Sequence, residues 1–218
     1  MHINQQQITD YESQYRARLI NSLSGFKSAN LVGTINDKGV TNLSIISSVF
    51  HIGASPALVG LIIRPHSVPR HTFENIQQTK RYTINHVSAG FWQQAHQTSA
   101  RYAHDKSEFT AVGLEEEYID GCIAPFVRQS KLKYALELRE VIHLAINGTE
   151  LVIGEITDIM VDHQAIRKDG YIDIESLETV SVSGLDSYHR SQRLARLTYA
   201  KPEKPLTNLS LDGEEGDK

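Results

Sequence analysis

Residues 40–64, "VTNLSIISSVFHIGASPALVGLIIR", contain most of the pattern that predicts the fold. The segments 29–35 and 40–52 are largely apolar and flank the turn-rich sequence "NDKG", which predicts a β-hairpin. Residues 57–64 form a short, nearly continuous apolar run, as in a strand buried on both faces. Neighbouring strands joined by short turns indicate antiparallel β-structure.

The sequence on either side of this stretch adds further strands and several helices. The segment 132–146 pairs with "ELVIGEITDIMV" across Asn147-Gly148, a strong hairpin signal, and residues 81–87 predict another strand. We expect a mainly β (α+β) fold, an antiparallel barrel with inserted and terminal helices. Helices are predicted at 5–23, ending before Gly25, at 71–79, at the start of 89–105 and at 186–197, whereas 107–125 has an irregular pattern.

The composition suits one globular domain with short extensions. The chain has 218 residues, 40% hydrophobic and 22% charged, which is enough apolar material for a core. Residues 201–218 contain prolines, glycines and acids and have little to bury. We expect an N-terminal helix in 1–27, the main domain with a C-terminal helix in 28–200, and a flexible acidic tail in 201–218.

Several classes of protein are disfavoured by what the sequence lacks. No run approaches the ~18–20 apolar residues of a membrane span, and the first residues do not resemble a signal peptide. With its single cysteine, Cys122, the chain suits a reducing compartment, so we expect a cytoplasmic protein without a membrane partner. The net charge of −4 disfavours nucleic acid as a partner. Rossmann and P-loop motifs are missing, and the ten histidines lack metal-site spacing, so we expect no metal site.

A cluster of cations and hydroxyls lies where a predicted strand gives way to a helix. Residues 62–76, "IIRPHSVPRHTFENI", contain Arg64 and Arg70, and the helix should begin between Ser67 and Thr72, which are candidate caps. The free amides of a helix start favour phosphate, and arginine binds phosphate oxygens in pairs. The alternative is a solvated cap whose arginines pair with surface acids. The segment by itself leaves both interpretations open.

The strand before this cluster carries polar side chains in an apolar setting. Asn42 and Ser44 share one face, and Ser47 lies on the other unless a bulge intervenes. Buried polar groups need hydrogen-bond partners, which a planar heteroaromatic ligand would supply, whereas a half-exposed strand with a polar outer face is the simpler alternative. Next to the cation cluster, these residues could hold an aromatic head with a phosphate tail, as in FMN, pyridoxal phosphate or any mononucleotide.

Four segments occur in the same order as in a known family. They are "GVTNLSIISSVFHIGASPALVGLIIRP", "SVPRHTFENIQQTKRYTINHV", "AHQTSARYAHDKSEFTAVGL" and "LVIGEITDIMV". In these segments the chain resembles the flavin reductase-like, FMN-binding split-barrel family, over residues 28–165, and the segment "VSVSGLDSYHRSQRLARL" is similar to the family's C-terminal part. The Pro-Pro often found after the family's flavin strand is replaced here by Ser55-Pro56.

The resemblance implies a six-stranded split barrel that forms a homodimer, with FMN, or alternatively FAD, near the subunit interface. It implies three groups of cofactor-binding residues: a strand that contacts the isoalloxazine and ribityl chain, a helix start that holds the phosphate, and a loop that borders the flavin from its own or the partner subunit. In that order they are Asn42, Ser44 and Ser47; Arg64, Ser67, Arg70 and Thr72; and Thr98 and Ser99.

The resemblance also implies an activity. It is that of an FMN-dependent oxidoreductase of the flavin-reductase type, with NADH or NADPH as a transient reductant and electrons passing through flavin to an acceptor. No catalytic acid or base is assigned, and His51, His66, His71 and His96 have no assigned role. Two alternatives stay open: a non-catalytic FMN-binding electron carrier or sensor, and an enzyme similar to pyridoxine-phosphate oxidase, against which the missing C-terminal pattern counts.

Overall fold

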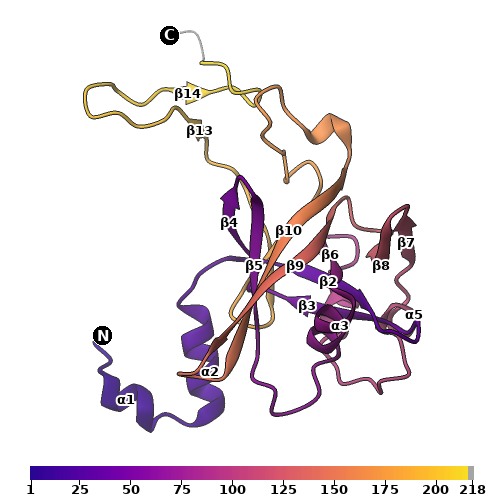
Figure 1. Ribbon diagram of the computed structural model, residues 1–218. Coiled ribbons are helices and arrows are strands. Elements are labelled where there is room, and N and C mark those ends of the chain that lie inside the picture. The colour runs from indigo at the N-terminus through magenta and orange to yellow at the C-terminus, as the bar shows by residue number, and fades with distance from the viewer. Residues whose placement is uncertain (216–218) are drawn as a thin grey trace.

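The centre of the protein is one antiparallel sheet of seven strands, where the resemblance implied six. A computed structural model of the chain describes residues 1–215. The strand order is β3-β2-β6-β9-β10-β5-β4, and the predicted mainly β, antiparallel class is confirmed (Figure 1). The strand bounds are β2 Asn30–Ile35, β3 Thr41–Ile46, β4 Phe50–Ala54, β5 Ala57–Ile63, β6 Arg81–His86, β9 Leu132–Leu144 and β10 Thr149–Val161.

Both predicted hairpins are confirmed, and each has turn residues that explain it. Between β2 and β3, the Asn36 side chain accepts hydrogen bonds from the amides of Lys38 and Val40, both at 2.9 Å. Between β9 and β10, Gly148 has a φ of +69°, which residues with a Cβ rarely adopt. Residues 40–64 thus form β3, β4 and β5, and they supply both edge strands of the sheet.

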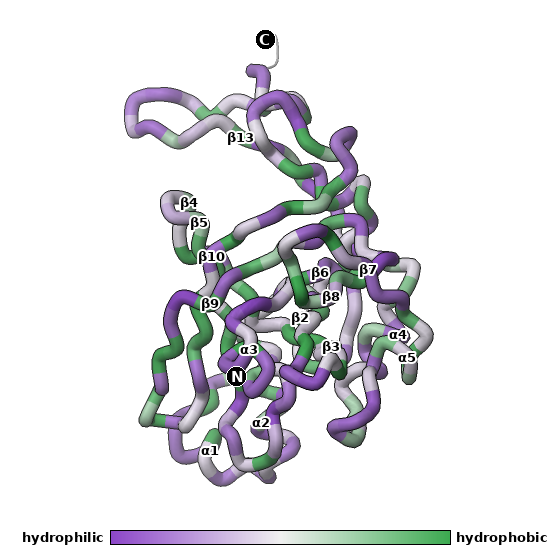
Figure 2. The backbone as a smooth tube through the Cα atoms, turned by 45° about the vertical axis from the view of Figure 1, so that its right-hand side comes forward, coloured by the Kyte–Doolittle hydropathy of each residue, from purple (hydrophilic) through white to green (hydrophobic). Residues whose placement is uncertain are grey.

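The inner core lies on one face of the curled sheet. Because side chains alternate along a strand, β2, β6, β9, β10 and β5 all direct apolar residues to this face. The helix α3, His71–Thr79, closes one side of the core with Phe73 and Ile76. Hydrophobic residues gather in these central strands, whereas the extensions at both ends of the chain are largely hydrophilic (Figure 2). The strand residues of the core are Val32, Val59, Leu61, Ile63, Tyr82, Ile84, Leu136 and Val152.

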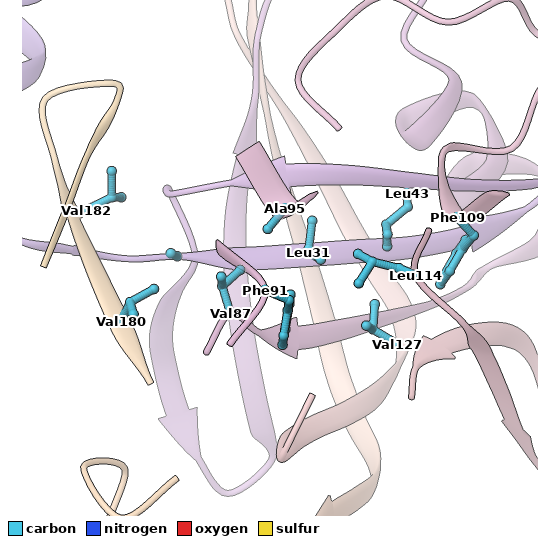
Figure 3. Close-up of a cluster of buried hydrophobic side chains, with 11 residues drawn as sticks. Leu31, Leu43, Val87, Phe91, Ala95, Phe109, Leu114, Val127, Val180 and Val182 are labelled. Atoms are coloured by element: carbon cyan, nitrogen blue, oxygen red, sulfur yellow. The ribbon is translucent and has the colours of Figure 1, made fainter. Parts of the chain in front are cut away.

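A second core covers the opposite face of β2 and β3 (Figure 3). Leu31 and Leu43 point from these strands toward two short helices, α4 Trp92–Gln97 and α5 Glu108–Val112. The remaining members of the cluster come from these helices, from their flanking residues, and from strands near the ends of the domain. They are Ala29, Val87, Phe91, Ala95, Phe109, Leu114, Val127, Val180 and Val182.

The segment 107–125 was expected to be irregular, and this expectation is wrong. Phe109 is 1% exposed, and the Pro125 carbonyl accepts a hydrogen bond from the Thr83 hydroxyl at 2.6 Å. These contacts with distant strands order the segment. The sequence of the segment has no periodic pattern from which such contacts could be predicted. Its elements are α5, β7 Glu116–Ile119 and β8 Cys122–Val127.

The N-terminal helix predicted at 5–23 is two helices, α1 Gln5–Asp10 and α2 Ser13–Ser22. The break has a local cause, because the Glu12 carboxylate accepts hydrogen bonds from the amides of Gln14 and Tyr15 and so caps a new helix. No residue of either helix is buried. The helical pattern ends before Gly25 as predicted, but its apolar face has no core to pack on in a single chain.

The helix predicted at 186–197 is absent, which corrects the sequence pattern. Residues 180–190 form a hairpin, and the chain then runs on as an extended arm. Arg193 binds Asp173 at 2.6 Å and Arg196 binds Asp169 at 2.5 Å, and these ion pairs to a distant segment favour the extended form. The strands of this region are β1 Lys27–Ser28, β11 Val180–Ser183, β12 Ser187–Arg190, β13 Arg196–Leu197 and β14 Asn208–Leu209.

The C-terminal arm, residues 191–215, projects away from the barrel (Figure 1). Within it β13 pairs with β14, so the arm crosses the predicted boundary at residue 200. That boundary and the flexibility of 201–218 stay predictions, and residues 216–218 lie outside the described part of the chain. Within residues 1–215, no helix is both long enough and apolar enough to cross a membrane.

Candidate functional site

Two hydrogen bonds hold the first half of α3 against the strands β2 and β3. The Asn42 side-chain amide donates to the Thr72 hydroxyl at 2.9 Å, and the Asn75 amide donates to the Thr34 hydroxyl at 3.1 Å. All four side chains are buried, so losing one partner would leave a polar group unsatisfied at a cost of about 1–3 kcal/mol. The fold therefore brings together Asn42 and Thr72, which lie 30 positions apart in sequence.

The helix α3 begins within the predicted range, but the predicted caps are wrong. Its N-cap is Arg70, and no side chain caps its first amides. Thr72 is already inside the helix and bonded to Asn42, and Ser67 lies exposed in the preceding loop. The Glu74 carboxylate accepts the amide of Arg70 at 3.1 Å and lies 3.1 Å from His66 Nε2, but it bonds none of the amides inside the helix. The amides of the first turn thus retain the positive potential that favours an anion.

Three arginines surround this helix start. The half-buried guanidinium of Arg70 donates to the Pro65 carbonyl through Nε and Nη2, both at 3.3 Å. Burial lowers the pKa of Arg70, and the charges of Arg64 and Arg101 lower this pKa further. Within residues 1–215, none of the three is in an ion pair with a carboxylate. The alternative of a solvated helix cap, in which these arginines pair with surface acids, is therefore wrong.

The polar residues expected on the flavin strand lie on the edge strand β3 and just beyond it. Ser44 is half-buried on β3, on the same strand face as Asn42. The strand ends at Ile46, so Ser47 lies in the bend that follows. Ser48 closes the gap toward β5, because its hydroxyl donates to the Ile62 carbonyl at 3.0 Å and accepts from the Ile62 amide at 3.2 Å. Ser48 was missed, although the pair of serines was visible in the sequence.

The loop after α4 reaches the same edge strand. The buried Thr98 hydroxyl accepts a hydrogen bond from the Ile45 amide at 3.0 Å and donates to the Ala95 carbonyl at 2.8 Å. Ser99 follows it and is exposed. Arg101, which the sequence pattern did not single out, lies in this loop, and its charge acts on Arg70. The loop thus contributes positive charge to the site as well as hydroxyls.

Glu108 is a buried acid that sequence patterns did not single out. Its carboxylate accepts a hydrogen bond from the Leu43 amide at 2.9 Å, in the middle of β3. Burial raises the pKa of Glu108, and the bond from Leu43 offsets part of that rise. In the sequence, the only hint of its burial was its position next to Phe109, in a segment whose pattern predicted no regular structure. It helps to hold α5 against the edge strand.

The four unassigned histidines fall into two groups. His51 is exposed on β4, and His96 lies on α4, where its Nδ1 is 3.0 Å from the Tyr188 hydroxyl. His66 and His71 lie at the start of α3, beside the arginines. The structure therefore separates two histidines on other elements from two that share the surroundings of the candidate anion site.

The chain matches a known protein family along most of its length. The sequence profile described as "Flavin reductase like domain" matches residues 24–175, which is more than half of the chain. The protein belongs to the flavin reductase-like family. The matched range includes every candidate site residue from Asn42 to Ser99, together with Arg101 and Glu108.

Solved structures show that this flavin reductase-like protein has the split-barrel fold. One from Shewanella frigidimarina, proposed to be a flavin reductase with a split barrel domain, is 58% identical, with a TM-score of 0.89 over 92% of this chain and 100% of that chain. Nitrilotriacetate monooxygenase component B from Bacillus cereus is 17% identical, with a TM-score of 0.80 over 90% and 98%. A 2-nitrobenzoate 2-nitroreductase from Pseudomonas fluorescens is 19% identical, with a TM-score of 0.79 over 94% and 98%. The last two share the fold alone.

Proposed function

We propose that the protein is an FMN-dependent oxidoreductase of the flavin-reductase type, which takes electrons from NADH or NADPH and passes them to an acceptor. The observation that carries this proposal is the group of three arginines without carboxylate partners at the uncapped start of α3. Guanidinium groups and free helix amides are the donors that phosphate prefers. The polar edge strand β3 lies directly against this helix start, as a phosphate-bearing flavin requires.

Each part of the site has a role in this proposal. FMN supplies the hydride and electron chemistry when bound, whereas the chain binds and orients it and excludes side reactions. Arg64, Ser67, Arg70 and Thr72 hold the phosphate. The strand residues and the loop after α4 face the rest of the flavin; they are Asn42, Ser44, Ser47, Thr98 and Ser99.

Anaerobic reduction tests the proposal. The purified chain is incubated with FMN, freed of excess flavin and mixed with NADH or with NADPH in the absence of oxygen. We expect a bound flavin spectrum that bleaches with at least one of the two nucleotides. A chain that shows no bound flavin after incubation would contradict the whole assignment. Bound flavin that stays oxidised with both nucleotides would instead indicate the electron carrier or sensor.

We propose further that the active form is a homodimer with the flavin near the subunit interface. The C-terminal arm supports this assembly, because it projects from the barrel with apolar side chains in solvent. Leu194 is 101% exposed and Tyr199 is 88% exposed. Such an arm in a single chain gains little from folding, so a second copy that covers it would stabilise it.

A further inference from the structure

Three side chains that bind metals in other proteins meet at the start of α3, although their spacing in sequence gave no metal signature. His71 and Glu74 are one turn apart on the helix, and His104 comes from the loop after α4. One possible ligand atom from each lies within 4.8 Å of the other two. The imidazole rings of His71 and His104 meet edge to face, with centroids 4.8 Å apart. The helix thus places His71 beside Glu74, and the loop after α4 brings His104 to them from about 30 positions further along the chain.

We propose that His71, Glu74 and His104 bind a divalent transition-metal ion of the zinc class. Two imidazoles and one carboxylate are a ligand set that such ions accept, with the fourth position open to solvent. Tetrahedral zinc with bonds of about 2.1 Å places its ligand atoms about 3.4 Å apart. Because the ligand atoms of the three side chains lie within 4.8 Å of one another, each pair must move closer by about 1.4 Å at most to bind zinc. Small rotations of the exposed His104 and the half-buried Glu74 can supply this movement.

The carboxylate of Glu74 is already oriented by neighbours that are not ligands. Its Oε1 accepts the Arg70 amide at 3.1 Å and lies 3.1 Å from His66 Nε2. Within residues 1–215, its other oxygen has no hydrogen-bond or ion-pair partner. Metal sites commonly have such outer contacts, which hold a ligand in place, and their loss costs about 10–100-fold in metal affinity. His66 is therefore a positioning residue for this site.

The cluster is open to solvent from one side. Glu74 and His104 line a surface hollow of about 580 Å³, together with Asn36, Asn75 and Gln78. His71 does not line this hollow, so a metal ion would reach Glu74 and His104 directly from solvent, without the protein unfolding. The nearby Arg70 and Arg101 oppose a cation, so we expect reversible binding and not a permanently held ion.

Titration of the full-length, tag-free chain with zinc chloride tests the site. We expect isothermal titration calorimetry to show one zinc ion per chain. His71→Ala and His104→Ala should each reduce the affinity at least about 100-fold, and His66→Ala by about 10–100-fold. The matched control is His143→Ala, since His143 also pairs with a glutamate, Glu150 at 2.8 Å, but has no third ligand. This variant should bind zinc as the unaltered chain does.

A second measurement uses the unaltered chain, so it does not depend on how the variants fold. Diethyl pyrocarbonate modifies accessible histidines, and mass spectrometry locates the modified residues. Zinc should slow the modification of His71 and His104 and leave His143 unchanged. The proposal is overturned if the chain binds no zinc, if the double variant His71→Ala/His104→Ala binds it normally, or if zinc protects neither histidine.

Discussion

At the scale of single residues, the arginines at the start of α3 distinguish this site from an ordinary helix cap. Arginines on the protein surface commonly pair with acids, as Arg139 does with Glu155 at 2.7 Å. Arg70 instead donates to a backbone carbonyl and lies near two further positive charges. Because these like charges repel one another and raise the free energy of the folded chain, an anion bound among them would relieve the repulsion.

Arg70→Ala should weaken FMN binding by about 1.5–3 kcal/mol, the contribution of a charged hydrogen bond, or about 10- to 150-fold in Kd. Riboflavin lacks the phosphate, so its affinity should change much less. Flavin fluorescence titrations measure both constants. Arg139→Ala, which removes an exposed and ion-paired arginine, is the matched control and should leave both unchanged. Equal losses for FMN and riboflavin would place Arg70 away from the phosphate.

His86 gives a prediction about pH. Burial lowers the pKa of His86 from 6.5 to about 4, and its Nδ1 has no hydrogen-bond partner within residues 1–215. Between about pH 6.5 and pH 4, His86 is protonated in the unfolded chain but stays neutral in the folded chain. The stability from this group is therefore complete above pH 6.5 and falls as the pH drops toward 4, by up to about 3 kcal/mol.

Urea unfolding at pH 7 and at pH 5 measures this effect. The free energy of unfolding should be lower at pH 5, and the difference should shrink in His86→Gln, which cannot take up the proton. His51→Gln, at an exposed position on β4, serves as the control and should keep the full difference. An unaltered pH dependence in His86→Gln would assign the loss of stability to other groups.

At the scale of elements, local patterns predicted those segments whose partners are near in sequence. The hairpins β2–β3 and β9–β10 and the helix α3 follow from turn residues and periodicity. The same patterns failed at 186–197, where helical spacing is present but Arg193 and Arg196 bind acids of a distant segment. They also failed at 107–125, since the contacts that order α5 and β8 are long-range.

The close packing of β8 on β2 depends on one glycine. A Cβ at Gly33 would lie 2.2 Å from the Pro125 carbonyl oxygen and 2.6 Å from the Thr83 hydroxyl. Gly33→Ala should therefore lower the free energy of unfolding by about 1–3 kcal/mol, as overpacking does. At Gly90 the nearest atom would be 3.7 Å away, so Gly90→Ala is the matched control and should have little effect. Urea unfolding compares the two, and equal stabilities would show that β8 moves away at little cost.

At the scale of the whole molecule, the two extensions are the parts that a single chain leaves without packing. The N-terminal helices bury no residue, and the C-terminal arm extends from the barrel (Figure 1). An isolated chain would have to order these segments against their conformational entropy with few contacts in return. Association of two chains would cover these segments, which is why we place the arm in the interface of the proposed homodimer.

The double variant Leu194→Ser/Tyr199→Ser tests that placement. Both side chains are exposed in the single chain, so their replacement should change neither its fold nor its circular dichroism. In the proposed dimer the two substitutions remove apolar area that the partner chain would cover. Two such buried side chains contribute about 1.5–3 kcal/mol each, so the dissociation constant of the dimer should rise at least tenfold. Analytical ultracentrifugation measures this. Ile146→Ser, an equally exposed apolar position in the turn between β9 and β10 and outside the arm, is the control. A dimer that the double variant leaves unchanged would exclude the arm from the interface.

Local sequence patterns were enough to predict the strands within 29–35 and 40–64, the long hairpin at 132–161, the helix at 71–79 and the positive charge of the segment around Arg64 and Arg70. These features depend on side-chain alternation, turn residues and local charge, all of which act over a few positions. The folded chain was needed to show that Asn42 contacts Thr72, that Arg101 and Glu108 lie at the candidate site, and that His104 lies beside His71 and Glu74. These contacts join segments 30 or more positions apart, and such contacts depend on how the whole sheet closes.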